Sequence, residues 1–316
     1  MFKKIIVLVL TLAMVMSFIG CNSSDASKGD SDSGIKIGMT VQSLENPIFS
    51  ESCDSLKKLV EADGGTMTYL SSDMKPNVQI EQIENFVTSG VDAIVIHPVD
   101  AAAVEGPLKK AREAGVLVFS WDDNLENADI TWLIDNYELG KVIGQEAAAW
   151  INEYHNGVAE VAVLDYPTIP ILLDRGNGII DAIKENAPNA TIVAQQPAIN
   201  AQEGITVMET VFQAHPDVQI VACIGGGGAT GANEAIKSSG KLTDVIGVFA
   251  ADATGPELAA MKADESNRMS VMITGDHNAI AKEIYELVTK KLAGNEMDKE
   301  QYRKLIPVNK DNIDQM

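Results

Sequence analysis

Short apolar runs rich in Val and Ile alternate with amphipathic stretches along most of this chain. Strands that are apolar on both faces belong to sheets covered by helices on both sides, and β-α-β order gives parallel strands with right-handed crossovers. The chain is long for one such sheet, so the pattern predicts an α/β fold of two doubly wound parallel sheets that divide near Asp135 and Asn136. The predicted strands are 35–41, 66–70, 93–97, 117–120, 131–134, 158–164, 191–194, 219–224, 245–250 and 269–273, and the predicted helices of the first half are 47–61, 77–88 and 101–114.

The loops that follow these strands are the predicted ligand site, because ligands of open parallel sheets bind outside the carboxyl ends of the strands. The loops gather amides, carboxylates and aromatic rings. Carboxylates and amides exchange hydrogen bonds with hydroxyl groups, and rings cover the apolar faces of a sugar, so this chemistry suits a polyhydroxyl ligand. The loops are 42–46, 71–73, 97–100, 120–124, 165–170, 224–228, 251–254 and 274–277.

The N-terminal region predicts an exported protein. Lys3 and Lys4 precede an apolar run over residues 5–19, which suits a signal peptide better than a membrane span of about 20 apolar residues. Residues 19–21 (Ile-Gly-Cys) are similar to a lipobox, which predicts a signal peptide over residues 1–20, lipidation of Cys21 and a flexible Ser/Asp/Gly-rich tether over residues 21–34. We expect an extracytoplasmic protein, lipid-anchored to the outer face of the cell membrane. A plain secretory signal and an uncleaved anchor are the alternatives.

Charge and cysteine usage limit the partners and cofactors. The net charge of −21 argues against nucleic acid or anionic lipid, both of which need a basic face. Cys53 and Cys223 fall in segments assigned to different sheets, so we expect small buried side chains rather than a disulfide. The four histidines are scattered, without the Cys, His and carboxylate spacing of a metal site. We predict no metal and no cofactor.

A glycine-rich motif offers a competing interpretation as an oxidoreductase of the NAD type. Residues 226–231 (Gly-Gly-Gly-Ala-Thr-Gly) satisfy G-x-G-x-x-G after a predicted strand, and Asp252 ends the next strand. The motif lies late in the chain, no candidate base for hydride transfer stands in a recognisable context, and such cofactors are scarce outside the cell. We therefore interpret the glycines as allowing close approach of the backbone to a ligand, or as leaving room for a bulky one. The chain lacks the G-K-S/T of a P-loop and the G-x-S-x-G of a hydrolase.

Several further segments occur in an order that is similar to one known family. They are 43–49 (SLENPIF), 90–100 (GVDAIVIHPVD), 114–119 (AGVLVF), 134–136 (IDN), 214–218 (AHPDV) and 306–312 (IPVNKDN). On these segments, residues 35 to 316 resemble the type I periplasmic sugar-binding proteins of the ribose- and galactose-binding group.

The resemblance implies two doubly wound domains joined by a three-strand hinge, which close around a ligand. The expected lobes are 35–135 with 276–303, and 136–275 with 304–316. It also implies a monomeric binding subunit of an ABC importer, which delivers a small sugar or polyol to permease subunits and is not an enzyme. A ligand-presenting sensor for a membrane receptor, recognising a sugar or a furanosyl signal, is an alternative with the same fold.

The family's ligand contacts transfer onto individual residues of this chain. Asn46 matches a hydrogen-bonding amide and Phe49 a stacking ring, although Asn46 also fits a helix N-cap before a proline. Asp122 and Asp252 match carboxylates that accept from sugar hydroxyls, and residues 274–276 cover a polar contact near the hinge. Trp121 is either a second stacking ring or a filler of the domain. The predicted ligand-binding set is Asn46, Phe49, Trp121, Asp122, Asp123, Gly225, Gly226, Asp252, Thr274 and Asp276.

The chain also departs from a ribose site. Asp123 stands where ribose binders often have Arg, Leu173 where the family commonly has Arg, and Gly225 where it usually has Asn; a further family contact falls near Ile199. The second-domain half of the site is therefore expected to be smaller, more apolar and less basic. We expect a ligand other than ribose, such as a deoxy sugar, a substituted pentose, a hexose or a furanosyl signal. If Gly226 and Gly228 make room for this ligand, larger residues there would abolish binding without unfolding the protein.

Overall fold

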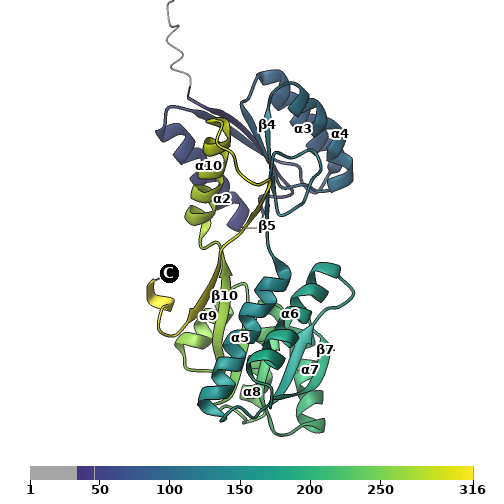
Figure 1. Cartoon of the computed structure of the whole chain (residues 1–316), viewed down its shortest axis with the longest axis vertical. Coiled ribbons are helices and arrows are strands. Elements are labelled where there is room, and N and C mark those ends of the chain that lie inside the picture. The colour runs from purple at the N-terminus through teal and green to yellow at the C-terminus, as the bar shows by residue number, and fades with distance from the viewer. Residues whose placement is uncertain (1–33, 46, 316) are drawn as a thin grey trace, which may run out of the picture. The chain divides into compact units, whose positions relative to one another are not determined.

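The computed structural model describes residues 34–45 and 47–315. The predicted signal peptide, the lipidation site Cys21, the tether up to residue 33 and Asn46 lie outside the described residues. The described chain forms two α/β domains, each built on a six-stranded sheet (Figure 1). We call the sheet that contains β1 sheet A and the sheet that contains β6 sheet B. The two predicted sheets are thereby confirmed.

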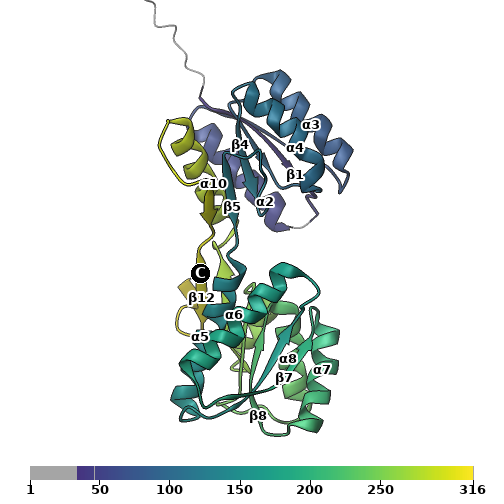
Figure 2. The same ribbon diagram turned by 45° about the vertical axis from the view of Figure 1, so that its right-hand side comes forward.

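Sheet A has the strand order β11-β5-β4-β3-β1-β2, and its strands pair in parallel. Helices α2 and α10 pack on one face, where Leu56 and Ile284 join the core, while α3 and α4 pack on the other face (Figures 1 and 2). The elements are β1 (Lys36–Val41), α2 (Pro47–Ala62), β2 (Thr66–Ser71), α3 (Pro76–Ser89), β3 (Ala93–Ile96), α4 (Ala101–Glu113), β4 (Leu117–Trp121), β5 (Ile130–Leu133), α10 (His277–Leu292) and β11 (Glu300–Tyr302).

Sheet B has the matching order β12-β10-β9-β8-β6-β7. Helices α5 and α6 share one core cluster with it, and α7 and α8 share another on the opposite face. The last strand, β12, runs antiparallel to β10, which differs from the parallel order expected throughout. The elements are α5 (Asn136–Tyr154), β6 (Glu160–Asp165), α6 (Pro170–Asn186), β7 (Thr191–Pro197), α7 (Ala201–Ala214), β8 (Val218–Cys223), α8 (Gly226–Ser238), β9 (Gly247–Ala251), α9 (Gly255–Lys262), β10 (Asn267–Ile273), β12 (Leu305–Asn309) and the 3-10 turn η1 (Ile313–Gln315).

Burial along the strands follows their place in the sheet. The central strands β3, β4 and β9 are buried at every residue, as continuous apolar runs predict. The edge strands β2 and β7 have several exposed residues, because an edge strand has a neighbour on one side only. The expectation of strands covered on both faces therefore holds for the centres of the sheets and not for these edges.

Three segments connect the two domains. The chain leaves sheet A between β5 and α5, returns between β10 and α10, and crosses again between β11 and β12. These segments lie side by side, since the Arg303 amide donates to the Leu133 carbonyl (2.8 Å) and the Thr274 amide donates to the Lys304 carbonyl (2.7 Å). The topology thus contains the three-strand hinge expected from the sequence.

The two described cysteines are free and buried in different domains, as predicted. Cys53 packs against the sulfur of Met39, and burial raises the pKa of its thiol to about 12, so this side chain behaves as an apolar filler. No helix among the described residues is long and apolar enough to cross a membrane.

Candidate ligand site

The two carboxylates predicted to bind ligand follow equivalent strands of the two sheets. Asp122 comes directly after β4 and Asp252 directly after β9, and each of these strands is third in its sheet. Both residues have left-handed backbone, with φ of +66° for Asp122 and +91° for Asp252. Such strain costs about 1–3 kcal/mol outside glycine and is concentrated at functional sites. The structure therefore places both carboxylates at the strand ends where a ligand of this fold class binds.

Asp122 is held by an arginine that sequence reasoning missed. Arg303, whose side chain is 8% exposed, donates from Nη1 to Asp122 Oδ1 (2.9 Å) and from Nε to Thr274 Oγ1 (3.0 Å). Its guanidinium also lies over the Trp132 ring, 4.6 Å from the ring centre. Arg303 follows β11, a three-residue strand without a clear sequence pattern, so nothing in the sequence marked it as a neighbour of Asp122.

Three rings from separate elements form an aromatic cluster beside Asp122. Phe49 of α2 stacks on His97, with ring centres 4.6 Å apart, and contacts Trp121 edge-on at 5.1 Å. Phe49 is partly exposed, as a stacking ring for a ligand must be, whereas Trp121 is 1% exposed. Trp121 is buried against Phe49 and His97, which favours the filler of its two proposed roles.

His97 is a second residue that sequence reasoning set aside. It follows β3, is 7% exposed, and its Nδ1 has no hydrogen-bond partner. Gln79 fixes the loop by donating to the His97 carbonyl (3.0 Å) and accepting from the Val99 amide (2.8 Å). Burial lowers the pKa of His97, and the nearby Asp122 carboxylate partly opposes this. The imidazole is therefore neutral near pH 7 and keeps an unused lone pair or N–H group at the site.

The second domain contributes Asp252, whose position depends on Gly225 and Gly226. The Gly226 amide at the start of α8 donates to Asp252 Oδ2 (3.0 Å). A Cβ atom on Gly225 would lie 2.9 Å from the same oxygen, so a larger residue there would displace the carboxylate. Nearby, Arg175 is buried and donates to the Ile224 carbonyl (2.6 Å) and to Asn136 Oδ1 (2.6 Å). Arg175 therefore uses its guanidinium group for hydrogen bonds within the second domain.

The glycines of residues 226–231 serve packing inside the protein, which corrects the expectation that they make room for ligand. A Cβ on Gly226 would lie 2.3 Å from Glu257 Oε2, and one on Gly228 would lie 2.8 Å from the Ala198 carbonyl. Both positions are filled by protein, so larger residues there would destabilise the fold. The Asp252 carboxylate also occupies the N-terminus of α8, where a dinucleotide would need its pyrophosphate.

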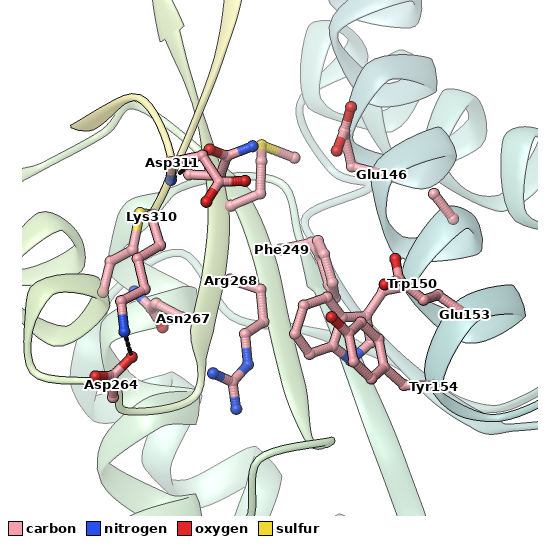
Figure 3. Close-up of a pocket in the computed structure, with 14 residues that line it drawn as sticks. Glu146, Trp150, Glu153, Tyr154, Phe249, Asp264, Asn267, Arg268, Lys310 and Asp311 are labelled. Carbon is pink, nitrogen blue, oxygen red and sulfur yellow. Dashed lines mark hydrogen bonds and ion pairs between the residues drawn. The ribbon is translucent and has the colours of Figure 1, made fainter. Parts of the chain in front are cut away.

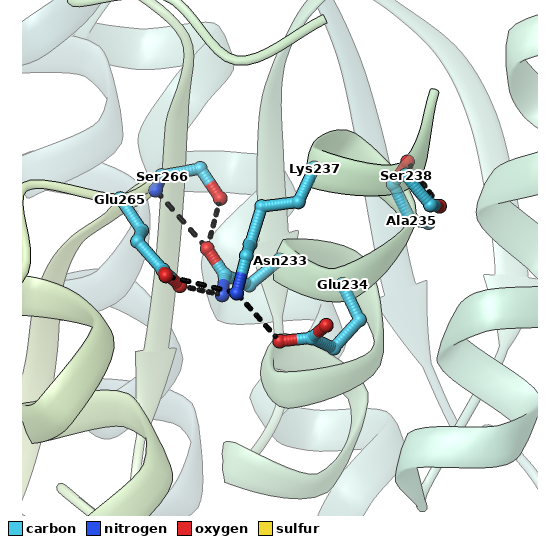
Figure 4. Close-up of polar contacts among 7 residues, drawn as sticks. All are labelled: Asn233, Glu234, Ala235, Lys237, Ser238, Glu265 and Ser266. Atoms are coloured by element: carbon cyan, nitrogen blue, oxygen red, sulfur yellow. Dashed lines mark hydrogen bonds and ion pairs between the residues drawn. The ribbon is translucent and has the colours of Figure 1, made fainter. Parts of the chain in front are cut away.

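The far end of α8 is fixed by a polar network (Figure 4). Asn233 donates to Glu265 Oε2 (2.6 Å) and accepts from the Ser266 hydroxyl (2.6 Å). Lys237 pairs with Glu265 (2.8 Å) and with Glu234 (3.1 Å). Close backbone packing therefore fixes the start of α8, next to Asp252, and this polar network fixes its end.

The hinge residues of the predicted set have structural partners. Thr274 is 4% exposed with φ of +72°, and its hydroxyl accepts from Arg303. Asp276 caps α10 by accepting from the amides of Asn278 (3.1 Å) and Ala279 (2.9 Å), and these bonds lower its pKa. Both residues therefore shape the second crossover, whatever contact they make with a ligand.

Several apolar side chains are exposed at the second-domain edge. Ile169, Ile171 and Leu173 at the start of α6 are 38%, 57% and 38% exposed, and Ile199 after β7 is 42% exposed. The expectation of a more apolar and less basic second-domain half stays a prediction.

A separate cavity of about 380 Å³ lies at the opposite edge of sheet B (Figure 3). It is bordered by the C-terminal part of α5, the start of β10 and the turn after β12. Arg268 lies over Trp150 at 5.0 Å and donates to the Ile246 carbonyl (3.0 Å), and Lys310 pairs with Asp264. Because its cations are already engaged and it lies at the amino ends of the strands, this cavity is distinct from the Asp122 and Asp252 site.

The family model of the periplasmic binding protein domain matches residues 37–296. The chain belongs to the periplasmic binding protein family. A ribose import binding protein of Bacillus subtilis is 28% identical over 304 residues, covering 94% of this chain and 96% of that protein. A galactofuranose-binding protein of Escherichia coli is 32% identical over 195 residues, covering 58% of this chain and 60% of that protein.

Solved structures of periplasmic binding proteins share the fold. A periplasmic ribose ABC transporter protein from Conexibacter woesei superposes with a TM-score of 0.78 at 22% identity, covering 91% of this chain and 96% of that one. The resemblance seen in the sequence and the two-domain fold that it implied are confirmed. Periplasmic binding proteins act outside the cytoplasm, in agreement with the expected export.

Proposed function

We propose that this chain is the extracytoplasmic solute-binding subunit of an ABC importer, which captures a small sugar or polyol between its two domains by hinge closure. The observation that supports this most is the pair of strained carboxylates, Asp122 and Asp252, at the ends of equivalent strands. Relatives that are named as import binding proteins for ribose and fructose support the same class of ligand.

The two carboxylates are suited to hydrogen bonds with hydroxyl groups. Arg303 occupies Oδ1 of Asp122, while Oδ2 has no donor among the described residues and can accept from a sugar. Phe49 offers an aromatic face next to it. A ligand that contacts both carboxylates stabilises the closed form by no more than its differential affinity for the closed and open forms. Binding makes and breaks no covalent bond, so no catalysis is proposed.

The lobes are 35–135 with 276–303 and 136–275 with 304–316. Cys21 is lipidated and tethers a monomer to the outer face of the cell membrane, and the liganded form docks on permease subunits. Transport is preferred to sensing because several relatives are named as import binding proteins.

A thermal-shift screen of the purified full chain against sugars, polyols, nucleosides and nicotinamide cofactors tests this function. A true ligand at about 1,000 times its dissociation constant should stabilise the chain by about 4 kcal/mol. Asp122→Ala should weaken that ligand by about 10- to 100-fold, since hydrogen bonds to charged groups contribute about 1.5–3 kcal/mol. Asp217→Ala, at an exposed site before β8, is the control and should bind as the wild type does. A shift with nicotinamide cofactors and none with sugars would refute the proposal.

A further inference from the structure

The carboxylates that follow the strands of both sheets nearly all accept hydrogen bonds from the protein. Arg303 donates to Asp122 and the Gly226 amide to Asp252, as described above. The others accept from nearby side chains or from helix amides; they are Asp73, Asp100, Asp135, Asp165 and Asp276. Asp123 is different, because its half-buried carboxylate has no donor among the described residues.

The position of Asp123 is fixed by its backbone. The Ser120 hydroxyl (2.7 Å) and the Leu125 amide (3.1 Å) both donate to the Asp123 carbonyl. The side chain is therefore held next to Asp122, and burial together with the Asp122 charge raises its pKa. A partly desolvated charge beside a like charge is unfavourable until a cation or a strong donor pairs with it.

No cation of the protein meets this need in the described chain. Arg303 is committed to Asp122 and Thr274, and Arg175 to Asn136 and the Ile224 carbonyl. His277, at the start of α10, lies 3.1 Å from Glu51. The exposed apolar side chains at the second-domain edge bring no charge either. The site therefore keeps one carboxylate that only a ligand or solvent can pair with.

The aromatic cluster includes Trp121, two residues before Asp123, and points to the same kind of ligand. His97 is 7% exposed and its Nδ1 has no partner, while Phe49 is partly exposed next to it. An aromatic face attracts a cation, and a neutral imidazole nitrogen can accept a hydrogen bond from an ammonium group. A neutral sugar can also donate to Asp123, but it leaves the carboxylate charge uncompensated.

We propose that the ligand of this site is cationic: an amino sugar or amino polyol whose ammonium group pairs with Asp123 beside the ring of Phe49. This inference rests on the proposed function, since it specifies which polyhydroxyl compounds the site prefers. Asp123 is then a specificity-determining residue, while Asp122 and Asp252 bind the hydroxyl groups.

Matched pairs of sugars test the inference on the unmodified full chain by calorimetry. The pairs are glucosamine with glucose, galactosamine with galactose, and mannosamine with mannose; N-acetylglucosamine keeps the ring and removes the charge. We expect the amino member of at least one pair to bind 10-fold or more tightly than its neutral and acetylated counterparts. The preference should fall when salt is raised, because a partly exposed ion pair is screened.

Two variants locate the effect. Asp123→Asn should reduce the preference for the amino sugar to less than threefold. Asp217→Asn removes the same charge at an exposed site before β8 and should keep the full preference. Tighter binding of neutral sugars than of amino sugars by the wild type would overturn this inference and leave the proposed function intact. Failure of every sugar to bind would overturn the proposed function as well.

Discussion

Gly226 is the residue at which sequence and structure give different reasons for the same amino acid. The sequence motif indicated that a side chain is not tolerated there, and the structure shows that the Glu257 carboxylate and the Thr254 methyl group occupy the space. Glu257 is 0% exposed and is held by Ser270 and Thr254, so it has little freedom to move. A glycine pattern predicts close contact but does not identify the contacting atoms.

We expect Gly226→Ala to lower the free energy of unfolding by about 1–3 kcal/mol, because overpacking a filled interior forces neighbours to shift. Gly255→Ala is the matched control, since a Cβ at Gly255 meets no atom within 4 Å. That variant should stay within about 0.5 kcal/mol of the wild type in a urea titration. An unchanged urea midpoint for Gly226→Ala would contradict the packing role and favour the interpretation that the glycines serve the ligand.

Other site residues differ in how well sequence could identify them. Asp122 and Asp252 directly follow strands, so topology pointed to them, and Phe49 belongs to the segment 43–49 that carries the family resemblance. His97 lies within the segment 90–100 but had no distinguishing signal, because its stacking on Phe49 depends on α2, which lies far away in sequence. Arg303 had no local signal, and only the folded hinge brings it to Asp122.

At the scale of elements, α9 is anchored by a buried acid. Thr254 and Glu257 form a capping box at its start, and Glu257 also accepts from the Ser270 hydroxyl of β10 (2.8 Å). Burial raises the pKa of Glu257 to about 7 despite these hydrogen bonds. The acid therefore binds a proton more tightly in the folded than in the unfolded chain.

This shift predicts a specific pH dependence of stability. The contribution of Glu257 is fully present below its unfolded pKa of about 4.5 and is lost as the pH rises to about 7, which amounts to roughly 3 kcal/mol. Glu257→Gln keeps the shape and cannot titrate. The wild type should therefore lose stability relative to this variant between pH 5 and pH 8 in paired thermal melts. Parallel curves for the two proteins would contradict the assignment.

The elements that sequence predicted well are those whose stability is local. The central strand β3 is an uninterrupted apolar run, and Gly90 with left-handed backbone caps the end of α3, so the type and the boundaries of these elements could be predicted from the sequence. Strands β11 and β12 were not predicted, because they are short, only partly buried and defined by pairing with β5 and β10. The antiparallel direction of β12 likewise follows from the third crossover and not from its own residues.

Across the two domains, Arg303 connects Asp122 with the hinge. It lies between β11 of sheet A and β12 of sheet B, and it contacts Asp122 of one domain and Thr274 at the end of β10 of the other. A rotation between the domains therefore either breaks one of these two contacts or is limited in extent by both. The same side chain therefore positions Asp122 and restrains the movement of the crossovers.

We expect Arg303→Leu to lower the free energy of unfolding by about 1–3 kcal/mol, because it leaves Asp122 without its donor. The decrease in radius of gyration on saturation with ligand, measured by small-angle scattering, should also become smaller or disappear. Arg303→Lys keeps the charge without the planar guanidinium group. Its free energy of unfolding and its compaction on ligand binding should therefore lie between those of the wild type and of Arg303→Leu. Wild-type compaction by the Leu variant would show that Arg303 does not take part in closure.

The order of the strands has a consequence for how the protein is made. Sheet A receives α10 and β11 from residues 277–302, and sheet B receives β12 from residues 305–309. Neither domain can complete its core until nearly the whole polypeptide has left the ribosome, although most of the first domain is synthesised early. Contacts between distant parts of a chain also form slowly. The same topology that builds the hinge therefore delays the completion of both domains until synthesis is nearly finished.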